Sequence, residues 1–210
     1  MSLYQRILGH PFVFNRIRPL FVGGIDWQPL YDALDAGPDA VVMDVGCGMG
    51  IAHKYLRSFR EYYGFDTDPV AIKLARQSAA GANIKYQCRV VTEDDVRNIH
   101  PTHVLLSGLL HHLSDAEVLK LLRMFGSVKS VRRIATADTV YIPGRHMSNV
   151  LAFLDRGRFV RTTEGFVALV EEANVEIVRK QIVRSNPTSG RALYLVMTLS
   201  PRPGEARRVT

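Results

Sequence analysis

Hydrophobic and polar positions between residues 38 and 200 alternate in a way that predicts strands interleaved with helices. The segment Val41–Val45 is a short, mostly apolar run rich in β-branched residues, which is typical of a buried strand. The same kind of pattern predicts strands over 62–66, 84–91, 103–106, 133–140, 175–183 and 192–199.

Capping residues mark where two of the helices begin. Asp68 is a good N-cap and Pro69 suits the first helical position. Ser114 and Glu117 form a capping-box pattern that opens a second helix. The expected apolar face of the first helix is Val70, Ala71, Leu74 and Ala75, and that of the second is Val118, Leu119, Leu121, Leu122 and Phe125. Helical spacing also appears at 166–173, and a short helix is expected over 51–57.

The order of these elements predicts an α/β fold with a doubly wound, mostly parallel sheet. The last two strands are joined by residues 184–191, which contain the turn signals Asn186-Pro187 and Ser189-Gly190 but no helical pattern. These two strands are therefore expected to pair antiparallel. In such folds, ligands bind beyond the carboxyl ends of the strands.

Composition narrows the class of protein further. The chain has 210 residues, of which 47% are hydrophobic and 22% charged, as expected for one globular domain. Two cysteines give no disulfide framework, and neither a signal peptide nor a membrane span is apparent, so we expect a cytoplasmic protein. The formal net charge of +7 is spread thinly, without a run of five like charges, which favours a solvated basic surface over a nucleic-acid site.

A glycine-rich loop, Asp44-Val45-Gly46-Cys47-Gly48-Met49-Gly50, follows the first strand. Glycines there allow sharp turns and a close approach of the backbone to a ligand. Asp66 stands twenty residues after Gly46, at the end of the second strand, where a carboxylate can accept hydrogen bonds from a ribose. The dinucleotide pattern G-x-G-x-x-G fails because its third position is Ile51, and no phosphate-binding P-loop motif occurs.

The segments DVGCGMG, YYGFDTD and LLSGLLHHL together resemble class I S-adenosylmethionine-dependent methyltransferases, over about residues 38–200. The resemblance implies a Rossmann-like, seven-stranded sheet whose last strand is antiparallel, with S-adenosyl-L-methionine across the tips of the first and fourth strands. It implies that the methionine part of the cofactor is lined by Asp44, Gly46, Cys47, Gly48 and Gly50. The ribose is assigned to Asp66 with Thr67, the adenine to Asp94 or Asp95 with the amide of Val96, and the region of the reacting methyl group to Ser107 and Gly108.

Methyl transfer is an in-line displacement in which the protein mainly aligns the nucleophile. His111 and His112 follow the fourth strand, so either is a candidate general base; the alternative is a structural turn that closes the pocket. No spacing of histidines and cysteines indicates a metal site. The candidate substrate contacts are Tyr4, Phe14, Arg18, Tyr141 and His146.

The resulting division of the chain is an aromatic cap or lid over 1–37, a methyltransferase domain over 38–200 and a basic, flexible tail over 201–210. The aromatic residues of the first segment could equally cover one edge of the sheet. The favoured function is methyl transfer to an oxygen, nitrogen or carbon atom of a small molecule. An RNA or DNA methyltransferase and a binder of the cofactor that transfers nothing are the alternatives, and a homo-oligomer is left open.

Overall fold

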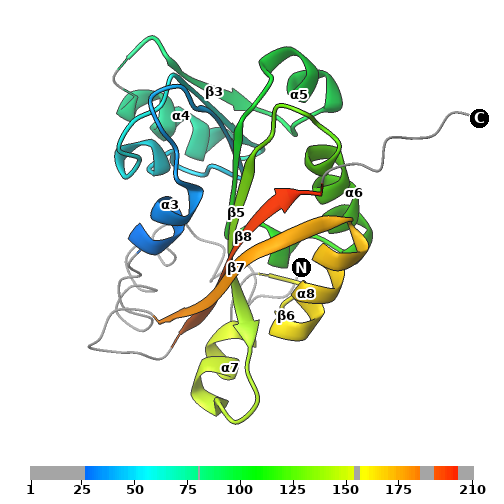
Figure 1. The fold of residues 1–210 in the computed structure, drawn as a ribbon. Helices are drawn as coiled ribbons and strands as arrows, with labels where there is room; N and C mark the ends of the chain where they lie inside the picture. Colours follow the sequence, from blue (N-terminus) through cyan, green and yellow to red (C-terminus); the bar gives the residue numbers. More distant parts are fainter. Residues whose placement is uncertain (1–26, 80, 154–156, 185–191, 203–210) are drawn as a thin grey trace, which may run out of the picture.

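The computed structural model describes residues 27–79, 81–153, 157–184 and 192–202 of the chain. Its strands are β1 (Val41–Val45), β2 (Glu61–Asp66), β3 (Ile84–Cys88), β4 (His103–Ser107), β5 (Arg133–Tyr141), β6 (Arg161–Thr162), β7 (Val175–Arg184) and β8 (Leu193–Pro201). They form one sheet in the order β3-β2-β1-β4-β5-β8-β7, and the two-residue strand β6 pairs with the end of β5 (Figure 1).

The direction of the strands confirms the predicted fold class. β1 is parallel to β2 and β4, and the parallel pairing continues to β3 on one side and β5 on the other. β8 lies between β5 and β7 and is antiparallel to both. The short β6 is an eighth strand beyond the seven that the sequence predicts.

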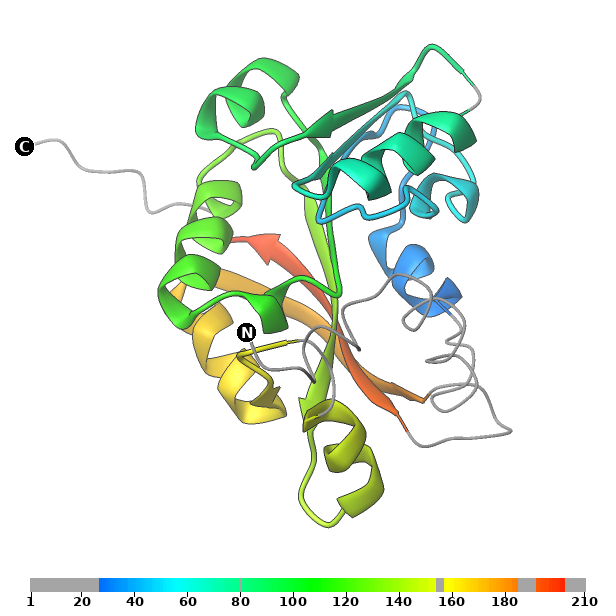
Figure 2. The same cartoon turned by 180° about the vertical axis from the view of Figure 1, so that it is seen from behind.

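Helices cover both faces of the sheet, giving three layers (Figure 2). The helices are α3 (Gln28–Leu34), α4 (Pro69–Ser78), α5 (Glu93–Ile99), α6 (Asp115–Gly126), α7 (His146–Phe153) and α8 (Thr163–Glu172). Residues of α3 and α4 pack into one buried cluster with β1, β2 and β4, whereas residues of α5, α6 and α8 pack into a second cluster on the opposite face.

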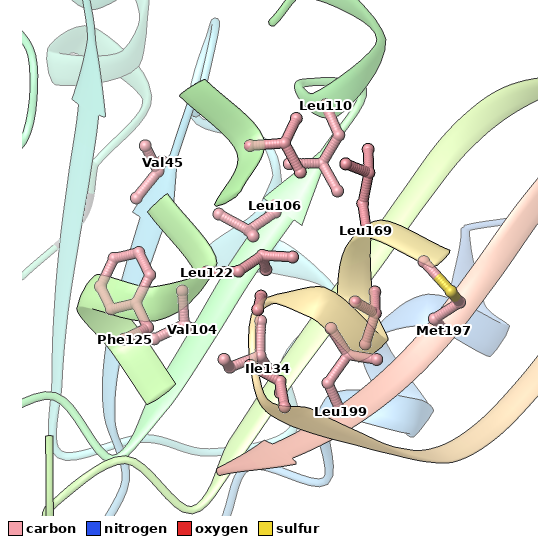
Figure 3. Packing of buried hydrophobic residues seen from close by; sticks show 14 of the residues in the cluster. Val45, Val104, Leu106, Leu110, Leu122, Phe125, Ile134, Leu169, Met197 and Leu199 are labelled. Atoms are coloured by element: carbon pink, nitrogen blue, oxygen red, sulfur yellow. The ribbon is translucent and has the colours of Figure 1, made fainter. Parts of the chain in front are cut away.

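The larger of these clusters follows from the alternation of side chains along the strands. Val104 and Leu106 of β4 point to the same face and contact α6 through Leu122 and Phe125, all four being fully buried (Figure 3). Leu169 of α8 extends this cluster towards β8. The core thus fixes the central strands, whose carboxyl ends carry the candidate site.

Three helices lack a clear signal in the sequence, and one has a different buried face from the one predicted. In α4 the buried residues are Ile72 and Ala75, whereas Val70 and Leu74 are 58% and 43% exposed. α3, α5 and α7 each have eight residues or fewer, so their apolar stripes are too short for a periodicity argument.

The loop regions also differ in detail from the prediction. β3 ends at Cys88 rather than continuing to residue 91, because Arg89 turns towards Asp95 of α5. The expected helix over 51–57 is a single 3-10 turn, η2 (Ala52–Lys54). Within the ranges that the structure describes, no helix is long and apolar enough to cross a membrane.

Candidate active site

The glycine loop between β1 and η2 is shaped by three left-handed residues. Gly46, Gly48 and Gly50 have φ angles of 76°, 52° and 67°, a region that side chains with a Cβ rarely adopt. The amides of Gly46 and Cys47 both donate to the carbonyl of Phe65, at 2.8 and 3.0 Å, which fastens the loop to the end of β2.

The glycines of this loop serve different purposes. A Cβ on Gly50 would lie 2.5 Å from the hydroxyl of Tyr86 and 2.8 Å from Ala75 of α4, so this position allows the loop to pack on its neighbours. A Cβ on Gly48 would meet no atom within 4 Å, and Gly48 lines the pocket described below. The backbone at Gly48 is therefore the part of the loop that a ligand can approach closely.

Asp66 joins this loop to the end of β2. Its Oδ2 accepts a hydrogen bond from the amide of Gly48 at 2.8 Å, and its Oδ1 accepts one from the amide of Asp68 at 2.9 Å. An ionised carboxylate offers about four acceptor positions, so it can still receive two further hydroxyl groups. That capacity matches a ribose diol.

Asp44 is a carboxylate buried within the sheet, 2% exposed, near the end of β1. Its Oδ2 accepts a short hydrogen bond from the hydroxyl of Tyr62, whereas its Oδ1 has no hydrogen-bond partner among the described residues. Burial raises the pKa of Asp44 to about 7, the bond from Tyr62 lowers it, and the nearby charge of Asp66 raises it. A buried, unpartnered oxygen at the edge of a pocket is suited to accept from a cationic group.

A pocket of about 330 Å³ opens beside the glycine loop. It extends from Asp44 and the glycine loop to Ser107 and Gly108 at the tip of β4, so it spans the ends of two adjacent strands. His111 and His112 line it as well. The aromatic residues Trp27, Tyr31 and Tyr194 also line it, and the rings of Trp27 and Tyr194 meet edge to face at 5.5 Å.

His111 is held in place by a carboxylate from the neighbouring strand. It lies in the 3-10 turn η3 (Leu110–His112), and its Nδ1 lies 2.7 Å from Oδ1 of Asp138 in β5. The same oxygen accepts the backbone amide of His111 at 3.1 Å, and both side chains are buried. A Cβ on Gly157 would lie 2.2 Å from the imidazole, so that glycine packs directly against the ring.

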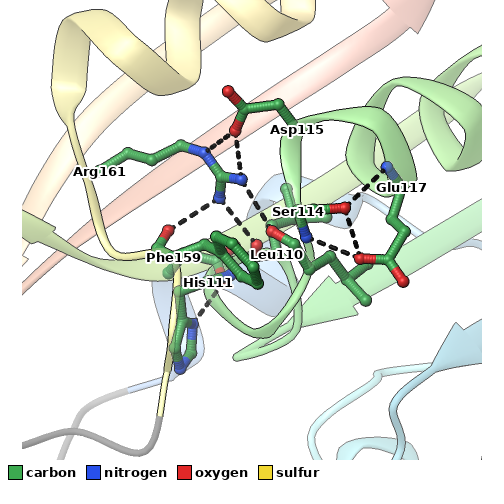
Figure 4. A network of polar contacts seen from close by, with 9 residues as sticks. Leu110, His111, Ser114, Asp115, Glu117, Phe159 and Arg161 are labelled. Carbon is green, nitrogen blue, oxygen red and sulfur yellow. Dashed lines mark hydrogen bonds and ion pairs between the residues drawn. The ribbon is translucent and has the colours of Figure 1, made fainter.

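Arg161 of β6 holds the turn that carries His111 (Figure 4). Its guanidinium donates to the carbonyls of Leu110 and Leu113 at 3.0 and 2.7 Å, to the carbonyl of Phe159 at 2.9 Å, and to the carboxylate of Asp115 at 2.6 Å. Because this side chain is only 10% exposed, the turn is tied to β6 and to the start of α6 by largely buried, charge-assisted bonds.

Several residues that the sequence analysis assigned to the site lie away from this pocket. Asp95 accepts bonds from Arg89 and Thr92 as the third residue of the capping box of α5, and the guanidinium holds its pKa well below the usual range. Asp94 pairs with Arg97 on the exposed surface, and the amide of Val96 donates within α5. Of the 14 described residues that line the pocket, none is Gly50, Asp66, Thr67, Tyr141 or His146. Tyr4, Phe14 and Arg18 lie outside the described residues.

Tyr194 and Asp138 were not assigned a role from the sequence, whereas Trp27 and Tyr31 belong to the aromatic segment 1–37 that was expected to form a cap or lid or to cover a sheet edge. Trp27 is the N-cap of α3, Tyr31 lies within this helix, and Tyr194 lies in a strand that is buried along most of its length. Asp138 did carry a signal, because it is a lone carboxylate within the apolar run of β5, as Asp44 is within β1. Among the described residues, no cluster of histidine, cysteine, aspartate or glutamate is arranged to hold a metal ion.

The sequence of the chain is similar to that of a known protein family. Residues 42–129 match the family described as "Methyltransferase domain". No curated protein matches the chain at a significant level.

Solved structures of methyltransferases share the fold. A chain of the complex between the Haloferax volcanii Trm112 methyltransferase activator and a methyltransferase has a TM-score of 0.65 at 13% identity, with 90% of this chain and 93% of that chain covered. The S-adenosylmethionine-dependent methyltransferase of Mesorhizobium loti gives 0.62 at 16% identity, covering 85% and 98%. Human N-acetylserotonin methyltransferase, solved in complex with its cofactor, gives 0.58 at 16% identity, covering 95% and 62%.

The family match and the structural comparisons point to the same fold. Residues 42–129 are similar to the methyltransferase-domain family, and the described part of the chain shares the fold of solved S-adenosylmethionine-dependent methyltransferases.

Proposed function

We propose that this chain transfers a methyl group to a small molecule, and that the accepting atom is the oxygen of a hydroxyl group. The observation that supports this is a single pocket that joins the glycine loop to an imidazole oriented by a carboxylate. The cofactor supplies an electrophilic methyl group on a sulfonium, so the protein needs to position the acceptor and remove its proton.

The cofactor half of the proposed site fits the residues present. The unpartnered oxygen of Asp44 suits the ammonium group of the methionine part, and the open space at Gly48 allows the backbone to approach it. Asp66 has acceptor positions left for the ribose. Thr67, Asp94, Asp95 and Val96 remain proposals for the nucleoside end.

The acceptor half contains the proposed general base, His111. If the proton on Nδ1 is donated to Asp138, the tautomer is fixed and Nε2 becomes the basic nitrogen. Asp138 also stabilises the imidazolium that forms when the hydroxyl loses its proton. A base of this kind is needed for a hydroxyl acceptor and would be superfluous for a neutral amine.

The walls of the pocket support a small acceptor. Among the described residues that line it, none is an arginine or a lysine that would receive a nucleic-acid backbone. Trp27 and Tyr31 line the pocket, so we propose that these two residues contribute to its acceptor side.

The test measures binding and transfer separately. Calorimetry should show that S-adenosylmethionine binds the wild type and the His111→Asn variant with similar affinity. Transfer of labelled methyl groups to a panel of small alcohols and phenols should fall about a hundredfold or more in the variant. His100→Asn, at an exposed histidine outside the pocket, serves as the control. Methylation of amines alone, or of RNA, or transfer that is unchanged in His111→Asn, would overturn the proposal.

A further inference from the structure

Tyr62 lies behind the pocket and is hydrogen-bonded to one of its lining residues, Asp44. The tyrosine is fully buried in β2 and does not line the pocket, but its hydroxyl donates to Oδ2 of Asp44. Asp44 lines the pocket, and its Oδ1 has no partner within the described part of the chain. Oδ2 of Asp44 is thus held by the hydroxyl of Tyr62, while Oδ1 remains available to a ligand.

Among the described residues, no cation acts on the pKa of Asp44. The titratable groups that act on it or that it acts on are Tyr31 of α3, Cys47 of the glycine loop, Tyr62 and Asp66 of β2, and Tyr86 of β3. His53 of η2 contacts the rings of Tyr62 and Tyr86, and burial lowers its pKa, so it is neutral at neutral pH. Burial and Asp66 raise the pKa of Asp44, and the bond from Tyr62 opposes them.

We propose that Tyr62 is a positioning residue for the cofactor, which orients the carboxylate of Asp44 and keeps it charged to receive the ammonium group of S-adenosylmethionine. This inference rests on the placement of the methionine part at Asp44 in the proposed function. Without the hydroxyl, the carboxyl group gains freedom to rotate and protonates at a higher pH. A neutral carboxyl group binds an ammonium group much more weakly than a carboxylate does.

The experiment compares two ligands on the Tyr62→Phe variant, which keeps the buried ring. S-adenosylhomocysteine carries the ammonium group, whereas 5′-methylthioadenosine shares the nucleoside and the thioether but lacks the amino-acid part. At about pH 7, calorimetry should show roughly a tenfold loss of affinity for S-adenosylhomocysteine and an unchanged affinity for 5′-methylthioadenosine. Between about pH 6 and pH 8 the affinity for S-adenosylhomocysteine should rise more steeply in the variant than in the wild type, because Asp44 loses its proton at a higher pH in the variant.

Two controls separate positioning from packing. Tyr63→Phe removes a hydroxyl that contacts Glu61 at 3.2 Å, and both ligands should bind it as they bind the wild type. In an Asp44→Asn background, Tyr62→Phe should cause no further loss for S-adenosylhomocysteine, because the charge it supports is gone.

Three results would contradict the inference or its premise, and they differ from one another. Equal affinity of Tyr62→Phe and wild type for S-adenosylhomocysteine at every pH would show that the hydroxyl does not position Asp44. An equal loss for both ligands would assign Tyr62 a purely structural role. A wild type that binds neither ligand would instead remove the proposed function itself.

Discussion

The backbone amide of Gly48 lies 2.8 Å from Oδ2 of Asp66, so the glycine loop and the carboxylate at the end of β2 are joined directly. The loop conformation and the position of the carboxylate therefore depend on each other. A change at either residue is expected to affect the cofactor site while the sheet behind it stays folded.

Asp66→Ala tests the carboxylate. It removes the acceptor for Gly48 and the proposed ribose contact, and each bond to a charged group contributes about 1.5–3 kcal/mol. We expect calorimetry to show a loss of S-adenosylmethionine affinity of about a hundredfold or more, with the circular dichroism spectrum unchanged. Asp68→Ala, which removes the N-cap of α4, should cost about 1 kcal/mol of stability and leave the affinity unchanged. If Asp66→Ala bound S-adenosylmethionine as tightly as the wild type does, Asp66 would not be the ribose contact.

Gly48→Ala tests the open position of the loop. The backbone at Gly48 is left-handed (φ 52°), which costs a residue with a Cβ about 1–2 kcal/mol, and the added Cβ also occupies space on the pocket side of the loop. Gly144→Ala is matched to it, since Gly144 has a φ of 75° and no atom within 4 Å of its Cβ position, but lies outside the pocket lining. Thermal unfolding should show similar losses of stability in the two variants, whereas only Gly48→Ala should lose cofactor affinity. If both variants lost cofactor affinity, the cause would be backbone strain and not a contact between Gly48 and the cofactor.

Asp44→Asn tests the energetic cost of the buried carboxylate. The pKa of Asp44 is raised to about 7 in the folded protein, above that of the unfolded chain, so the folded state binds the proton more tightly. The associated stability is present below about pH 4 and is lost as pH rises towards about 7. Thermal melts of the wild type without ligand should therefore show a decrease over that interval, which Asp44→Asn removes, making the variant more stable than wild type at about pH 8. If the melting temperatures of Asp44→Asn and the wild type changed in parallel with pH, Asp44 would not titrate in this pH interval.

Arg161→Lys tests the support of the histidine turn. Lysine keeps the charge but cannot reach the carbonyls of Leu110 and Leu113 and the carboxylate of Asp115 together, which should cost about 1–3 kcal/mol of stability. Methyl transfer should fall while calorimetric affinity for S-adenosylmethionine stays unchanged. Arg123→Lys, at an exposed pair with Glu172, should change stability by less than about 0.5 kcal/mol. An unaltered transfer rate in Arg161→Lys would mean that the turn does not need this anchor.

The sheet could be predicted because its central strands β1, β4, β5 and β8 are mostly buried and the helices α4, α6 and α8 have long enough patterns. The capping box at Ser114 and the N-cap at Asp68 both form as the sequence indicates. The short helix α5 is missing from the elements predicted from the sequence, although Thr92 and Asp95 have capping-box spacing, because only Val96 of this helix is buried. Elements that bury so little give a pattern too weak to recognise.

The part of the pocket wall formed by the glycine loop and the tip of β4 could be located from the sequence, because both directly follow predicted strands. The partners that residues of the pocket meet across the fold could not, because they come from distant parts of the chain. Trp27 meets Tyr194 only when α3 packs on β8, and His111 meets Asp138 only when β4 and β5 have paired. Contacts between residues that are distant in sequence cannot be predicted from a local sequence pattern.

Arg161 anchors the turn that carries His111, so the sequence on the far side of this anchor can change without a change in the glycine loop. The stretch between Tyr141 and Arg161 leaves the sheet after β5 and returns to it at β6. Substitutions or insertions in this stretch would remodel the wall next to His111 without disturbing the glycine loop on the other side of β4. Homologues with new acceptors are therefore expected to vary most between these two positions and to keep the nucleoside half intact.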